Sequence, residues 1–255
     1  MSELVNPHDR FFKEALTQPD AARDFLRYYL PPEVAELLDL SNLQLVKDTF
    51  VDEELREHFS DLLYEVRLAD GSGAYVYVLF EHKSHPDPLV AFQVLRYMVR
   101  VWDYALRQKL RLWPILPVVM YHGVARWSVA LDFQELFDVP EVFRPFMPTY
   151  RYWVCDLAGY SDEELKGAVV LRVALLVMKS IFREDLRARL PEVLSLLYNL
   201  SMEETGLGYV EAVLRYLVTA TDRVTEADLR EVMENTFPEG GALMDTIAQR
   251  WLERG

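Results

Sequence analysis

The sequence of 255 residues contains one cysteine, Cys155, so the chain cannot form an internal disulfide. It has no apolar run of about 18 residues, the length that a membrane-spanning helix needs. Its first residues lack the basic start and apolar segment of a signal peptide. No glycine-rich phosphate loop or dinucleotide fingerprint is present. We therefore expect a cytoplasmic protein with no membrane partner and no nucleotide cofactor.

The composition is that of an ordinary globular protein, with 51% hydrophobic and 27% charged residues. The net charge of −14 excludes a uniformly basic surface for nucleic acid. One segment, 96–126, reverses this balance and has Asp103 as its single acidic residue. A local positive patch can bind phosphates although the rest of the surface is acidic. The basic residues of this segment are Arg96, Arg100, Arg107, Lys109, Arg111 and Arg126.

Hydrophobic periodicity divides the chain into an N-terminal α/β part and a helical C-terminal part. We expect an α/β core over 1–158 and an all-helical region over 159–255. The predicted helices of the core are 9–29, interrupted or kinked near Pro19, then 32–40 and 89–108. The predicted strands are 43–51, a hairpin over 61–83, 116–121 and 150–157. The predicted C-terminal helices are 161–183, 185–200, 207–221, 225–236 and 240–253, the first of them starting at a capping box, Ser161-x-x-Glu164.

The hairpin carries the most informative charged residues, Asp61 before its first strand and Glu81 and Lys83 at the end of its second. Asp70-Gly-Ser-Gly73 is a strong turn signal between the strands. A two-residue loop at Gly71-Ser72 would place Asp61 opposite His82, whereas a three-residue loop from Asp70 would place it opposite Glu81. Glu81 and Lys83 share a face of the strand, and His82 points to the other face. A site with both carboxylates together therefore predicts an odd loop, or a bulge, near Gly71.

Two carboxylates and an ammonium group in one place suit phosphodiester hydrolysis. Mg²⁺ prefers carboxylate and carbonyl oxygens and needs only one or two carboxylates from the protein. Such a cation also removes the repulsion that raises the pKa of one of two neighbouring carboxylates. A bound water becomes a better nucleophile, and a lysine can orient it or stabilise charge on the phosphate. Mn²⁺ can substitute for Mg²⁺ in this expectation.

Asp61, then Glu81-x-Lys83, resembles the PD-(D/E)xK nuclease motif, with Ser60 in place of the motif's proline. The surrounding segments resemble the Rpn family of recombination-promoting nucleases, also called YhgA-like putative transposases. The resemblance covers the chain from about residue 6 to its end and implies a restriction-endonuclease-like core, with a central mixed β-sheet flanked by helices. It also implies a bacterial, Mg²⁺-dependent DNA endonuclease. The segments that carry it are 8–14, 50–55, 60–65, 79–84, 95–98 and 117–123.

The resemblance assigns roles to individual residues. Asp61 and Glu81 become metal ligands, the backbone carbonyl of His82 a further ligand, and Lys83 the catalytic lysine. An acidic residue on the first helix often completes such sites, and Glu14 and Asp9 are both candidates. The remaining assignment is Gln93 as a catalytic glutamine on the helix after the hairpin. The basic segment 96–126, rather than the resemblance, offers Arg96, Arg100 and Arg107 as contacts to DNA.

Two alternatives remain open at this point. A nuclease-like fold can serve as a catalytically silent DNA-binding or scaffolding module. A transposase with strand-transfer activity is the other alternative, although its chemistry generally uses three carboxylates on a different fold. DNA is the expected partner in each case, and a homodimer is plausible because such nucleases often pair to cut both strands.

Overall fold

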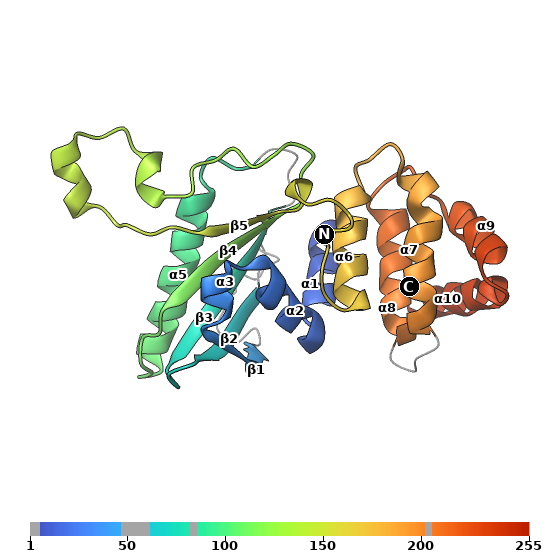
Figure 1. The fold of residues 1–255 in the computed structure, drawn as a ribbon, viewed down its shortest axis with the longest axis horizontal. Coiled ribbons are helices and arrows are strands. Elements are labelled where there is room, and N and C mark those ends of the chain that lie inside the picture. The colour runs from blue at the N-terminus through green and yellow to red at the C-terminus, as the bar shows by residue number, and fades with distance from the viewer. Residues whose placement is uncertain (1–5, 47–61, 82–85, 202–205, 255) are drawn as a thin grey trace. The chain divides into compact units, whose positions relative to one another are not determined.

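A computed structural model describes residues 6–46, 62–81, 86–201 and 206–254 (Figure 1). The chain divides into two compact units. One unit is formed by 16–164 and contains a β-sheet, and the other is formed by 1–15 together with 165–255 and is helical. We call them the sheet unit and the helical unit.

The described strands form one mixed sheet in the order β1-β2-β3-β4-β5. β1, β2 and β3 pair antiparallel, whereas β3–β4 and β4–β5 pair parallel. The parallel step from β3 to β4 requires a crossover, which the helix α5 (Val90–Arg107) provides. The predicted α/β fold, with a mixed sheet and C-terminal helices, is confirmed. The strand bounds are β1 Leu38–Leu45, β2 Leu62–Leu68, β3 Gly73–Glu81, β4 Ile115–Tyr121 and β5 Trp153–Asp156.

The β2–β3 hairpin has the predicted strands in a different register. Leu62 faces Val78, two residues nearer the turn than Phe80, its partner in the predicted three-residue loop. The last paired residues, Arg67 and Gly73, are separated by residues 68–72, an odd number. Positions of the two strands that an odd loop predicts to point to the same side of the hairpin therefore do so, although the directly paired residues differ. The turn is closed by the N–H of Leu68, which donates to the Ser72 carbonyl, and by Gly71 at φ +83°.

The N-terminal part of the sheet unit differs from expectation in two places. The predicted helix 32–40 ends early, because α3 spans Pro32–Ala35 and β1 begins at Leu38. The predicted strand 43–51 therefore begins too late. β1 is irregular between Asp39 and Gln44, where the Asp39 carboxylate accepts hydrogen bonds from the backbone and side chain of Ser41. Such side-chain bonds compete with ladder pairing and bend the strand.

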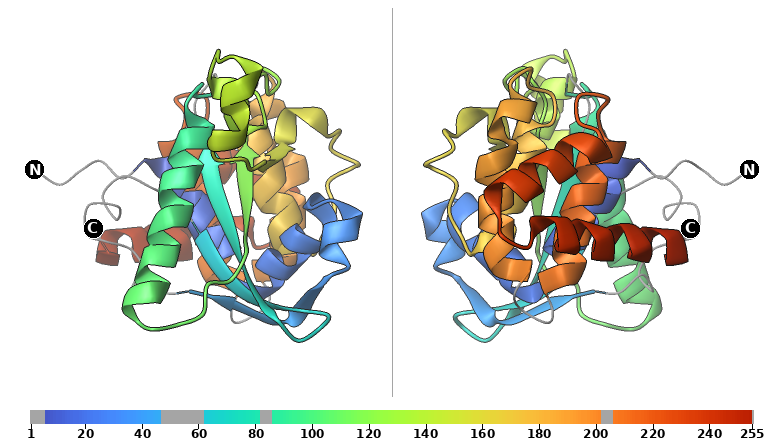
Figure 2. Two further views of the ribbon diagram at one scale, coloured as in Figure 1. Left: turned by 90° about the vertical axis from the view of Figure 1, so that its left-hand side faces the viewer. Right: turned by 90° about the vertical axis from the view of Figure 1, so that its right-hand side faces the viewer.

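α5 (Val90–Arg107) packs along one face of the sheet, as Figures 1 and 2 show. Its inward residues follow helical spacing and bury against side chains of β2, β3 and β4. The rings of Tyr77 on β3 and Tyr97 on α5 stack with centroids 3.9 Å apart. Because β3 and β4 are fully buried around Val78 and Val118, α5 is anchored to the most protected part of the sheet.

The opposite sheet face is covered within this unit by α2 (Pro19–Tyr29). The predicted helix 9–29 is two helices in the structure, because the chain is interrupted before Pro19. The first of them, α1, spans Pro7–Leu16. The Tyr64 hydroxyl donates to the Leu16 carbonyl at 2.6 Å, and Trp153 donates to the Tyr29 carbonyl at 2.7 Å. The long connection between β4 and β5 contains the 3₁₀ turns η2 (Phe133–Leu136) and η3 (Glu141–Phe146).

The helical unit contains the C-terminal helices, which follow the predicted order. α6 begins at Val169, eight residues after Ser161. The reciprocal bonds of the predicted capping box form between Ser161 and Glu164, but they close only a turn before Gly167 at φ +110°. A true capping box starts α9, between Thr225 and Asp228. The bounds are α6 Val169–Ser180, α7 Leu186–Ser201, α8 Gly206–Thr219, α9 Glu226–Thr236 and α10 Gly240–Arg254. Within these described segments, no helix has the length and apolar character needed to cross a membrane.

The C-terminus of α5 closes with a Schellman motif built on a lysine. Leu110 N–H donates to the Ala105 carbonyl at 2.8 Å, and Lys109 N–H donates to the Leu106 carbonyl at 3.0 Å. Lys109 is left-handed, at φ +57°, where a side chain with a Cβ is strained by about 1 kcal/mol or more. Glycine has no such strain and is the usual residue here.

We predict that Lys109→Gly raises the free energy of unfolding by about 1 kcal/mol, because it removes this strain. The urea midpoint of the tryptophan fluorescence transition measures it, since Trp102 donates to the Trp113 carbonyl beside this turn. Gln108→Gly is the matched control, because Gln108 has a right-handed backbone at φ −83°. That control should destabilise by about 0.5–1 kcal/mol. A shift of the same sign in both variants would contradict the account.

Candidate functional site

The hairpin brings the start of β2 and the end of β3 to the same edge of the sheet. β2 begins at Leu62, which directly follows Asp61 in the chain, and β3 ends at Glu81. The main chain of Glu81 is in register with Tyr121, the last residue of β4. The structure describes the main chain of Glu81 but not its side chain. β3 and β4 both end at this edge, and the chain around it contains the predicted metal ligands.

Three of the predicted site residues, Asp61, His82 and Lys83, lie outside the described residues. Among the residues that the structure describes, no group of three or more His, Cys, Asp or Glu side chains is arranged to hold a metal ion. The ligand set of Asp61, Glu81 and the His82 carbonyl therefore stays a prediction.

Gln93 and the three predicted DNA-binding arginines all lie on α5, which follows the end of β3 in sequence. Gln93 is half-buried in the first turns of the helix, and Arg96 is exposed one turn later. Arg100 is half-buried, and its Nη1 is enclosed with no hydrogen-bond partner among the described residues. Arg107 is exposed and paired with Asp103. From Gln93 to Arg107 the helix rises about 21 Å, so these groups form a row rather than one cluster.

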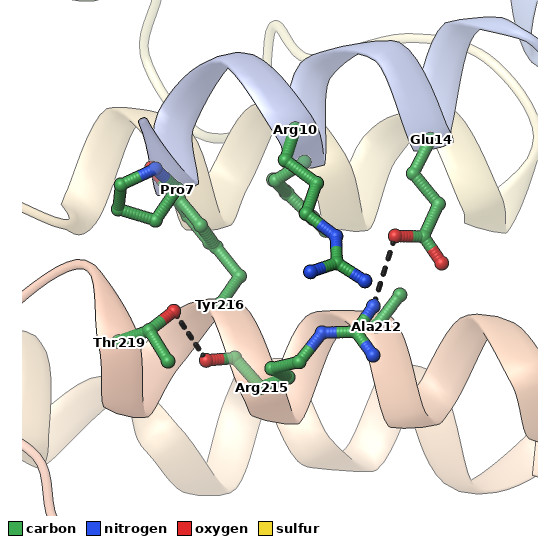
Figure 3. A pocket seen from close by; sticks show the side chains of 8 residues that line it. Pro7, Arg10, Glu14, Ala212, Arg215, Tyr216 and Thr219 are labelled. Carbon is green, nitrogen blue, oxygen red and sulfur yellow. Dashed lines mark hydrogen bonds and ion pairs between the residues drawn. The ribbon is translucent and has the colours of Figure 1, made fainter. Parts of the chain in front are cut away.

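Glu14 lies in the helical unit, on α1, where it forms an ion pair with Arg215 of α8 at 3.1 Å (Figure 3). Arg215 also approaches Glu211 at 3.7 Å, and Arg250 of α10 approaches the same carboxylate at 3.5 Å. Glu211 is 1% exposed, so these guanidinium groups neutralise a buried carboxylate. Asp9, the other acidic candidate, lies in the first turn of α1.

A pocket of about 280 Å³ lies between α1 and α8 beside this ion pair. Figure 3 shows the guanidinium groups of Arg10 and Arg215 and the carboxylate of Glu14 around it. Its apolar wall includes Phe11 and Tyr216, whose rings stack 4.2 Å apart. The Tyr216 hydroxyl is 2.8 Å from Nδ1 of His8, and burial raises the pKa of this tyrosine well above its usual value.

Sequence reasoning missed this pocket. The spacing of Arg10 and Glu14 places both on one side of a helix, which is the single local signal available. Arg215, the partner of Glu14, is 201 residues away from it, and no motif connects the two. The ion pair assigns Glu14 a structural role in the helical unit, and its predicted role as a metal ligand stays a prediction.

Comparison with known proteins identifies the class of this chain. Residues 6–207 match the family described as "Putative transposase, YhgA-like". The match spans more than half of the chain, so the protein belongs to this family.

Curated relatives align over nearly the whole chain. The recombination-promoting nuclease RpnD of Escherichia coli O157:H7 is 30% identical, over 96% of this chain and 93% of the relative. RpnA of E. coli K12, also named a recombination-promoting nuclease, is 29% identical over 98% of this chain and 84% of its own length. RpnE of the same strain, 28% identical over 100% of this chain and 84% of its own, is named an inactive nuclease-like protein. No solved structure matches.

We predict that Glu14→Gln lowers the free energy of unfolding of the helical unit by up to about 1 kcal/mol, because the ion pair with Arg215 is only partly buried. Thermal unfolding followed by circular dichroism measures the effect, and 1 M NaCl should reduce it. Glu192→Gln on α7 is the matched control, because Glu192 is exposed and has no ion pair within the described part of the chain. Equal shifts for the two variants would contradict a stabilising role.

Proposed function

We propose that this chain is a Mg²⁺-dependent DNA endonuclease of the PD-(D/E)xK type, which hydrolyses phosphodiester bonds in DNA recombination or in the movement of mobile elements. The observation that carries the proposal is the hairpin edge, where the strand after Asp61 begins and the strand through Glu81 ends. The names of RpnA and RpnD as recombination-promoting nucleases support it.

The observed register supports the pairing of carboxylates that the proposal needs. Leu62 faces Val78, so continued pairing would set position 61 opposite Leu79, on the same side of the ribbon as position 81. Among the described residues, the two predicted loops would have paired Leu62 with Glu81 or Phe80 rather than with Val78. Adjacent same-face positions on neighbouring strands are close enough for two carboxylates to share one cation.

In this proposal Asp61, Glu81 and the carbonyl of His82 hold the cation. A bound Mg²⁺ supplies an activated water and neutralises charge on the scissile phosphate. Lys83 orients the water or stabilises charge on the phosphate, and Gln93 contributes to the same site from α5. Arg100 stays a proposed DNA contact, although its Nη1 is enclosed and has no partner among the described residues, so this side chain has to move before a phosphate can reach that nitrogen.

We expect Asp61→Ala, Glu81→Ala and Lys83→Ala each to reduce Mg²⁺-dependent nicking of supercoiled plasmid by at least about 100-fold. Circular dichroism should show an unchanged fold. Calorimetric titration with Mn²⁺ gives a readout besides activity, and the Asp61 and Glu81 variants should lose the binding heat. Glu33→Ala, an exposed acidic residue on α3 of the same unit, should change neither measurement. Full nicking by the Asp61 or Glu81 variant would refute the assignment.

The proposed role of Glu14 as a further ligand requires a separate comparison. Glu14→Gln and Arg215→Gln both remove the ion pair between α1 and α8. If Glu14 binds the cation, only Glu14→Gln abolishes nicking, and this is the expected outcome. Loss of activity in both variants would show that the ion pair itself is required, and activity in both would remove Glu14 from the ligand set.

A second candidate function is favoured by one finding, the relative RpnE, which is named inactive. A catalytically silent DNA-binding or scaffolding protein would retard DNA in a mobility shift with no cleavage under any divalent cation. The family description names a transposase, and a strand-transfer assay with labelled donor ends separates that activity from simple hydrolysis.

A further inference from the structure

α5 has an apolar outer face that the fold of the sheet unit does not use. Val90, Val94, Tyr97 and Val101 point inward and are buried against the sheet. On the other side, Phe92, Val99 and Leu106 are 47%, 51% and 58% exposed. Large apolar side chains exposed in one line along a helix are typical of an interaction surface rather than of a solvated face.

The spacing of this face is that of a coiled-coil seam. Phe92, Val99 and Leu106 recur every seven residues, which keeps them on one line of the helix. A second row interleaves with them at intervals of three and four, as the a and d positions of a heptad do. It consists of Leu89, Arg96, Asp103 and Leu110, of which Leu89 precedes the helix and Leu110 follows it. We call the two rows together the α5 seam.

We propose that the α5 seam binds the α5 seam of a second copy of this chain, in antiparallel orientation about a two-fold axis beside Val99. The charges in the seam carry this choice of partner. In that arrangement Arg96 of each copy lies opposite Asp103 of the other, and Leu89 lies opposite Leu110. Phe92 lies opposite Leu106. A two-fold interface requires such a self-complementary surface.

Other orientations and partners fit less well. Parallel pairing would place Arg96 on Arg96 and Asp103 on Asp103, which repels at both positions. A DNA phosphate would suit Arg96 but would leave the exposed Phe92, Val99 and Leu106 facing a polyanion and Asp103 facing like charge. Asp103 already pairs with Arg107 of its own helix, and a carboxylate has acceptor capacity for a second guanidinium group.

This inference does not depend on the nuclease proposal, since it uses none of the proposed metal ligands. It assigns Arg96 to a protein contact rather than to DNA, and it leaves Arg100 to the DNA. It also gives the molecule a two-fold arrangement in which two proposed catalytic edges belong to one particle, as cutting both strands would require.

Sedimentation equilibrium of the full chain tests the pairing by molecular mass. The wild type should be a dimer at micromolar concentration. Arg96→Asp and Asp103→Arg should each weaken dimerisation by roughly tenfold or more, because each creates two like-charge contacts. The double variant R96D/D103R restores opposite charges across the axis and should return the dissociation constant to within about threefold of wild type. A monomeric wild type, or a double variant as weak as the single ones, would overturn the proposal.

The apolar row is tested by a matched pair of substitutions. Leu106→Asp should abolish the dimer, whereas Leu37→Asp should leave it intact, because Leu37 is 56% exposed but lies outside the seam. Thermal unfolding at a concentration where all variants are monomeric confirms that each is folded. Equal dimerisation of the Leu106 and Leu37 variants would overturn the proposal.

A DNA mobility shift with the same variants separates the two roles of Arg96. If Arg96 acts only through the dimer, R96D/D103R binds DNA as the wild type does. If Arg96 bound a phosphate instead, the double variant would remain as defective as Arg96→Asp in DNA binding, and its mass would not respond to the charge reversal. That second pattern rejects the seam without affecting the nuclease proposal, which depends on Asp61 and Glu81.

Discussion

The hydrogen bonding of β3 to both of its neighbours is the constraint on which the rest of the sheet unit depends. Antiparallel pairing with β2 brings the start of the hairpin to the edge where Glu81 ends β3, and parallel pairing with β4 forces the chain through α5. Burial of β3 on both faces makes this arrangement expensive to change. The candidate catalytic edge and the orientation of α5 are thus two consequences of one strand's pairing.

Much of this arrangement could be predicted from the sequence, because period-two and period-3.6 patterns report burial directly. The register could not, since the paired residues place the centre of the turn at Asp70, with Leu68 N–H donating to the Ser72 carbonyl, whereas the turn signal predicts a centre at or after Gly71. The start of β1 was also missed. The sequence around Leu38 has a helical pattern, whereas its strand conformation depends on pairing with Leu68. That pairing is a long-range contact, which local propensity does not predict.

Ser161 shows the opposite failure, in which the local signal is correct and the inferred element is absent. Both bonds of the capping box form with Glu164, yet the helix starts at Val169, because a cap satisfies the donors of a first turn without supplying the packing that sustains later ones. The ion pair of Glu14 and Arg215 escaped prediction for a different reason. It is made by tertiary packing across 201 residues of sequence, so composition on either helix is uninformative about it.

α5 shows why charge composition and charge position predict different functions. Counted as a segment, its arginines form a basic patch suited to phosphates. Placed on the helix, Arg96 stands in line with Asp103 between exposed apolar residues, whereas Arg100 lies beside that line with an enclosed nitrogen. Net charge sets long-range attraction, but a specific contact depends on which side chains share a face. In the two proposals, therefore, the same helix presents the α5 seam to a second copy of the chain, and the proposed DNA contact of Arg100 lies beside that seam.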